Sequence, residues 1–113
     1  MLIKIPFEEF NKSVLIERGY KEHPDGSFWW TDKKEMASHS FVFVVIVSPY
    51  AYYATATVFD PSDPPADPAR HGKILATWLD DEMQKITDTV IEIGNEMYLA
   101  NREEAGDESA KLK

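Results

Sequence analysis

A run of seven apolar residues at positions 41–47 constrains the fold more than any other stretch of the chain. The run is short and rich in β-branched residues, and polar or turn-forming residues bound it on both sides. These features are typical of a β-strand rather than a helix. Successive side chains of a strand point to opposite faces of its sheet, and here both faces are apolar. We therefore predict a central strand in a sheet that is covered on both sides.

Turn residues and helical periodicity place the elements near the N-terminus. Pro6 suits the first turn of a helix and Gly19 suits its C-cap, so a helix is expected at 6–18, after a short strand at 2–5. The spacing of the apolar residues within this helix indicates one buried face.

Three further segments surround the central strand. A β-hairpin is expected from strands at 20–22 and 28–31, and a charged loop is expected at 32–37. A return strand is expected at 51–59, and its more polar face should see some solvent; that face carries Tyr53, Thr55, Thr57 and Phe59. The predicted fold class is α+β: an antiparallel sheet of three to five strands, with a short N-terminal helix and a long C-terminal helix packed on one face.

The C-terminal helix is expected to begin at Asp67 and Pro68, after a proline-rich crossover, and to end near Arg102. Its apolar residues alternate spacings of three and four, as in a heptad seam: Ala76, Leu79, Met83, Ile86, Val90, Ile93, Met97 and Ala100. Residues 1–102 are therefore interpreted as a single domain, and 103–113 as an acidic tail that is expected to be disordered.

The length of this helix raises a packing problem. A helix of that size spans roughly 50 Å, whereas a seven-residue strand spans roughly 23 Å, so one sheet face cannot cover the whole seam. Two solutions are open: the helix breaks near Gly94, or its second half packs on a second copy or a partner helix. In the second case the contact residues are Val90, Ile93, Met97 and Ala100.

Net charge is −8 over 113 residues, and the excess lies near the C-terminus, where positions 80–108 hold ten acidic and two basic residues. This distribution disfavours direct contact with nucleic acid and suits a basic protein surface as partner. The chain has no cysteine, and we expect no signal peptide, no membrane span and a cytoplasmic location.

The sequence patterns that could indicate a catalytic or metal site are weak. His23-Pro24-Asp25 is the tripeptide of J-domain co-chaperones, but Gly26 and an aromatic strand follow it, which favours a turn. Asp60, Asp63 and Asp67 lack the spacing of a calcium loop, and Asp80, Asp81 and Glu82 point in different directions on a helix. The histidines His23, His39 and His71 form no metal-binding pattern. No catalytic residue, cofactor or metal is expected, and the chain is not expected to be an enzyme.

Two surface features remain as candidate protein-binding sites. An acidic stripe on one face of the C-terminal helix comprises Asp81, Asp88, Glu92, Glu96 and Glu103. Trp29 and Trp30 are adjacent on a strand, so they face opposite sides, and one can serve as an interface anchor.

The sequence thus favours a small acidic protein-binding module. The specific hypothesis is an inhibitor that occupies the basic, nucleic-acid-binding surface of a partner, by analogy with phage-encoded or mobile-element-encoded inhibitors. The alternatives are a structural homodimer or adaptor that uses the helix seam, or an immunity-type partner of a toxin.

Overall fold

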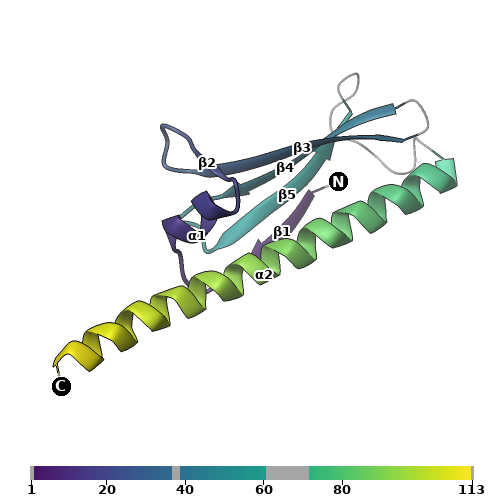
Figure 1. Ribbon diagram of the computed structural model, residues 1–113. Helices are drawn as coiled ribbons and strands as arrows, with labels where there is room; N and C mark the ends of the chain where they lie inside the picture. Colours follow the sequence, from purple (N-terminus) through teal and green to yellow (C-terminus); the bar gives the residue numbers. More distant parts are fainter. Residues whose placement is uncertain (1, 37–38, 61–71, 113) are drawn as a thin grey trace.

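The computed structural model describes residues 2–36, 39–60 and 72–112, with side chains described as far as Glu103 (Figure 1). The predicted α+β class is confirmed: one antiparallel sheet, one short helix and one long helix. The elements in chain order are β1 (Leu2–Pro6), α1 (Lys12–Glu17), β2 (Lys21–Glu22), β3 (Phe28–Met36), β4 (His39–Val47), β5 (Tyr53–Phe59) and α2 (Gly72–Leu112).

The sheet has five strands in the order β1-β5-β4-β3-β2, and every neighbouring pair is antiparallel. The apolar run lies in β4, so the prediction of a central strand is confirmed. The predicted first strand is also confirmed, and it continues to Pro6 at the edge of the sheet, where a missing N–H does little harm.

One face of the sheet forms the hydrophobic core together with α2. Phe41, Phe43, Val45 and Val47 of β4 all point to this face and are at most 2% exposed. On the neighbouring strand Ala54 and Ala56 share the face, and α2 approaches β5 and β1 most closely. Small side chains at these positions leave room for the apolar seam of the helix.

No helix in the described part of the chain covers the other face of the sheet, so the expectation that both faces are covered is wrong. Val42, Val44 and Ile46 point to this face, but α1 and α2 both lie on the opposite side of the sheet (Figure 1). Within the described residues no helix or loop packs over it. The apolar run predicted a strand correctly, but not the number of layers packed against it.

The N-terminal helix is shorter than predicted, because Pro6 ends β1 and does not begin a helix. Helix α1 starts after Asn11, whose side-chain oxygen accepts a hydrogen bond from the backbone N–H of Val14 at 3.3 Å. The predicted C-cap is confirmed: Gly19 has φ +88, and the N–H of Tyr20 donates to the carbonyl of Leu15 at 3.0 Å.

The predicted loop at 32–37 is also corrected, since β3 continues as a strand through Met36, and Ala37 lies outside the described residues. The two-residue β2 pairs only with Phe28 and Trp29, so the rest of β3 is an edge strand. A charged segment suits such an edge, because alternating charges oppose pairing with another chain.

Helix α2 continues without a break through Gly94, so the predicted break is wrong. Its second half packs on the segment before α1. Asn11 donates to the side-chain oxygen of Asn101 at 2.9 Å, and Asn101 donates to Glu9 at 2.9 Å. The Cβ of Phe7 would lie 3.5 Å from a Cβ added at Gly94.

The ends of α2 differ in what can be compared with the prediction. The proposed start at Asp67 and Pro68 lies outside the described residues. The backbone is helical as far as Leu112, beyond the predicted end near Arg102. Side chains after Glu103 are not described, so the expectation of a disordered tail at 103–113 stays a prediction.

Candidate functional site

The uncovered face of the sheet, here called the open face, has an aliphatic centre with aromatic residues around it. Val44 at the centre is 7% exposed, whereas Val42 and Ile46 on either side of it are partly exposed. The register places these residues beside others that point the same way: Trp29 of β3, Tyr53, Thr55, Thr57 and Phe59 of β5, and Leu2 of β1. The prediction that this face of β5 sees solvent is confirmed, since Tyr53 is 37% exposed.

The charged residues on the open face are mostly basic. Lys4, Lys21 and Lys33 project on this side and are exposed, with Glu35 as the acidic exception. The ammonium of Lys4 lies 4.9 Å from the centre of the Tyr53 ring, where the electron-rich face of the ring attracts it. In a chain whose net charge is −8, this face is locally positive.

Trp29 lies at one end of the open face and is held in place by the β2–β3 turn. Its indole N–H donates to the Ser27 hydroxyl at 2.8 Å, and the His23 ring stacks on it with centroids 4.5 Å apart. Asp25 accepts hydrogen bonds from the N–H of Ser27 at 2.9 Å and from its hydroxyl, which lower the pKa of Asp25. The tripeptide at 23–25 is therefore a turn, as predicted.

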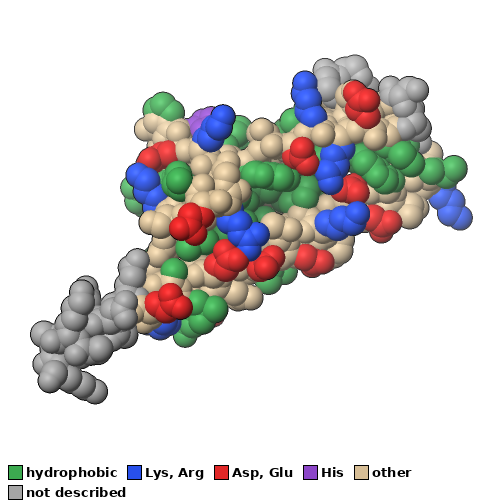
Figure 2. Space-filling view, viewed as in Figure 1, with side chains coloured by type: hydrophobic (Ala, Val, Ile, Leu, Met, Phe, Trp, Pro, Cys, Tyr) green, Lys and Arg blue, Asp and Glu red, His purple; other side chains and the backbone are tan. Residues whose placement is uncertain are grey.

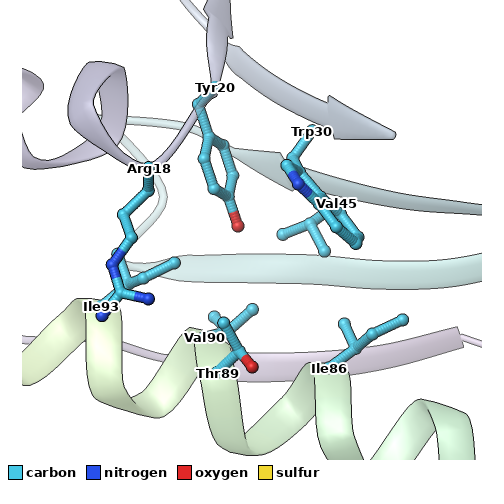
Figure 3. A pocket seen from close by; sticks show the side chains of 8 residues that line it. All are labelled: Arg18, Tyr20, Trp30, Val45, Ile86, Thr89, Val90 and Ile93. Carbon is cyan, nitrogen blue, oxygen red and sulfur yellow. The ribbon is translucent and has the colours of Figure 1, made fainter. Parts of the chain in front are cut away.

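Trp30 points to the opposite side, into a cavity between the sheet and α2. The cavity has a volume of about 250 Å³ and is lined by Arg18, Tyr20, Trp30, Val45, Ile86, Thr89, Val90 and Ile93. Figure 3 shows the Tyr20 hydroxyl directed into this space from above, with the α2 side chains below it. In Figure 2 hydrophobic side chains gather in the hollow between the sheet and α2, with acidic and basic side chains along the helix.

Arg18 pairs with two of the five residues of the predicted acidic stripe, Glu92 and Glu96. The guanidinium of Arg18 forms a bidentate ion pair with Glu96 and lies 3.5 Å from Glu92. The hydrogen bonds from Arg18 lower the pKa of Glu96. Asp81, Asp88 and Glu103 are exposed, and within the described residues no cation pairs with them.

A second group of charges connects the sheet to α2. The Glu82 side chain is 9% exposed and accepts a hydrogen bond from Lys34 of β3 at 2.5 Å and another from Lys85 at 3.2 Å. The hydrogen bond from Lys34 is the main cause of the lowered pKa of Glu82. This acid is part of the core boundary rather than a free surface charge.

The proposed dimer seam is occupied within the chain itself. Val90, Ile93 and Met97 are 2–6% exposed and belong to the hydrophobic core, and Ala100 packs against that core. The segment before α1 and the sheet already cover these residues, so they offer no free surface to a second copy. The burial of these residues within the chain gives no support to the seam as a contact site, which stays a prediction.

Sequence reasoning predicted solvent on one face of β5, but it missed that the same face of β4 is also uncovered, and it missed the cavity. A signal for the open face was present: β5 has threonines on the same side as the outward residues of β4. The cavity gave no such signal, because its lining comes from segments as far apart as Arg18 and Ile93.

The described parts of the chain show no metal centre: no group of three or more His, Asp or Glu side chains there could hold an ion. In residues 2–36, 39–60 and 72–112 there is also no helix that is long and apolar enough to cross a membrane. Comparisons of the chain with protein-family models, with curated proteins and with solved structures gave no match.

Proposed function

We propose that this chain is a small protein-binding module that contacts its partner through the open face. The observation that supports this proposal is the position of both helices on one side of a sheet whose other side has an apolar centre (Figure 1). Apolar side chains on this face reach water at Val42, Ile46, Tyr53 and Leu2, although Val44 between them is buried, and exposed apolar patches commonly mark interaction sites.

The charges around the open face indicate the kind of partner. Lys4, Lys21 and Lys33 would be repelled by a basic surface and attracted by an acidic one. The partner is therefore a protein with an apolar patch bordered by Asp and Glu residues. A second copy of the chain fits less well, because it would bring the same lysines together.

The size of the open face is consistent with a modest interface. The five strands are two to nine residues long, and with a rise of about 3.3 Å per residue and a spacing of about 4.8 Å they give a face on the order of 500 Å². A standard interface takes about 800 Å² from each partner, so the contact would extend onto the lysine border and neighbouring exposed residues such as Tyr50, which is 83% exposed.

The test compares two lysine substitutions of similar size. Ile46→Lys places a charge on the open face, and Thr77→Lys places one on an exposed position of α2. With lysate of the source cells, wild type and Thr77→Lys should capture the same partner, whereas Ile46→Lys should not. A double change, Lys4→Glu with Lys33→Glu, should also abolish capture. Retained capture by Ile46→Lys, with an unchanged melting temperature, would contradict the proposal.

A second candidate function keeps the acidic stripe as the contact site. Asp81, Asp88 and Glu103 face solvent along one rigid helix, which favours the occupation of a basic protein surface, as an inhibitor or an immunity-type partner would require. Glu92 and Glu96 contribute less, because Arg18 already neutralises them in part.

The two proposed contact sites predict different effects on partner binding when acidic charges of α2 are removed. Changing Asp81 and Asp88 to Asn leaves the Arg18 ion pairs intact and removes only unpaired acids. If the stripe is the contact site, this variant loses its partner, and the partner is released from wild type by high salt. If the open face is the contact site, this variant still captures the partner.

A further inference from the structure

A tyrosine hydroxyl opens into the cavity between the sheet and α2. Tyr20 is 5% exposed, and Figure 3 shows its hydroxyl directed into the cavity. Among the described residues, no side-chain or backbone group forms a hydrogen bond with this hydroxyl, and its oxygen is not fully buried, so water in the cavity can reach it. Burial raises the pKa of Tyr20, so the hydroxyl keeps its proton and can donate.

The remaining walls of the cavity are mainly apolar. Val45 of β4 and Ile86, Val90 and Ile93 of α2 provide aliphatic surface, and Trp30 provides an aromatic ring. A volume of about 250 Å³ would hold several waters, but such walls give each water few hydrogen-bond partners. The cavity therefore suits an apolar occupant with one group that accepts a hydrogen bond from Tyr20.

The volume of the cavity and the charges at its border narrow the range of possible ligands further. A cavity of about 150 Å³ binds benzene, and this one is larger, so a two-ring molecule is the better match. The Trp30 ring favours an aromatic occupant, which can stack against it. Arg18 at the border is paired with Glu96 and Glu92, and the three charges together are negative, so an anionic ligand would gain little there.

We propose that this cavity binds a neutral, two-ring aromatic molecule that carries one hydrogen-bond acceptor, and that the Tyr20 hydroxyl donates to this acceptor. The site lies on the helix-covered side of the sheet, so it is separate from the open face. It stands or falls independently of the proposed protein-binding function.

The probes are 1-tetralone and tetralin, which have the same two-ring frame and differ in the ketone oxygen. Methyl NMR spectra of the full chain report on Val45, Ile86, Val90 and Ile93 directly. Both probes should shift these methyl signals, and 1-tetralone should bind about 2- to 10-fold more tightly, as one neutral hydrogen bond allows. Tyr20→Phe keeps the ring and should remove this preference without weakening the binding of tetralin.

A second variant tests the cavity without touching a core residue. Thr89 is exposed at the border of the cavity, so Thr89→Trp should fill the entrance and abolish the binding of both probes at an unchanged melting temperature. Thr77→Trp, on an exposed position of the same helix, is the matched control and should bind both probes as wild type does.

Three results would overturn the proposal. The first is no shift of the cavity methyl signals at millimolar concentrations of either probe. The second is an undiminished preference for 1-tetralone in Tyr20→Phe. The third is a set of shifts confined to the open face, which would place the probes on the protein-binding surface.

Discussion

The two faces of the sheet differ in surroundings although one strand supplies similar residues to both. On the covered face, Phe43 and Val45 of β4 are at most 1% exposed under α2. On the open face, Val42 and Ile46 of the same strand remain partly exposed. The comparison shows that an apolar, β-branched run specifies a strand, whereas the rest of the chain decides whether each face is covered. The apolar seam of α2 packs on only one of the two faces.

This difference has a direct energetic consequence. Removing a side chain from a packed core leaves a cavity that the surroundings fill only in part, which adds to the loss of apolar burial. The same removal on a face in contact with water leaves no such cavity.

Phe43→Ala should have the largest effect, because Phe43 is completely buried beside Trp78 of α2, with ring centroids 6.1 Å apart. We expect a loss of about 3–5 kcal/mol in the free energy of unfolding, measured by urea denaturation. A loss below about 1 kcal/mol would show that α2 does not cover this face in solution.

Val45→Ala and Val42→Ala form a matched pair on one strand. Val45 is 1% exposed and should cost about 1–2 kcal/mol, whereas the partly exposed Val42 should cost about 0.5 kcal/mol or less. The measurement is again urea denaturation, with the slope m as a check that both variants unfold in the same way. Equal losses at the two positions would mean that something covers the open face.

Val45→Thr and Val42→Thr repeat the comparison with almost no change in shape. At Val45 the new hydroxyl would be buried among apolar groups and should cost about 1–2 kcal/mol. At Val42 water can reach the hydroxyl, and the threonines of β5 already point to that face, so thermal melting should detect almost no change. A similar drop in melting temperature for both variants would contradict the assignment of the two faces.

The ion pairs on the covered side should make the free energy of unfolding decrease as the pH is lowered into the acid range. The pKa values of Glu82 and Glu96 are lowered in the folded state, so their stabilising contribution is present above the unfolded pKa, near 4.5, and is lost as pH falls below it. Glu82→Gln should remove about 1 kcal/mol at pH 7 and flatten the fall between pH 5 and 3, in urea denaturation at several pH values. A decline as steep as in wild type would show that Glu82 does not carry this dependence.

The sequence predicted local structure well where the signal was local. The strand at 41–47, the turn at 23–26 and the cap at Gly19 each follow from adjacent residues, and the structure has all three. The start of α1 was wrong because Pro6 suits a strand edge as well as a helix, and the side-chain cap of Asn11 determined the outcome.

Long-range features could not be predicted in the same way. The pairing of Glu92 and Glu96 depends on Arg18, which is separated from both by most of the chain. The seam of α2 needed no partner because the segment before α1 packs on its second half through Asn11 and Asn101. Which apolar face is left open depends on where α2 packs, and the pattern within β4 does not contain that information.

The most direct test of the open face as a protein-binding surface is site-specific photo-cross-linking in the source cells. A photoreactive phenylalanine analogue at Thr55, on the open face, is compared with the same analogue at Asp88, on the outward side of α2. The proposed function predicts a specific adduct with another protein from Thr55 and none from Asp88. An adduct from Asp88 alone would contradict it in favour of the acidic stripe, and an adduct from Thr55 of twice the chain's own mass would identify the partner as a second copy.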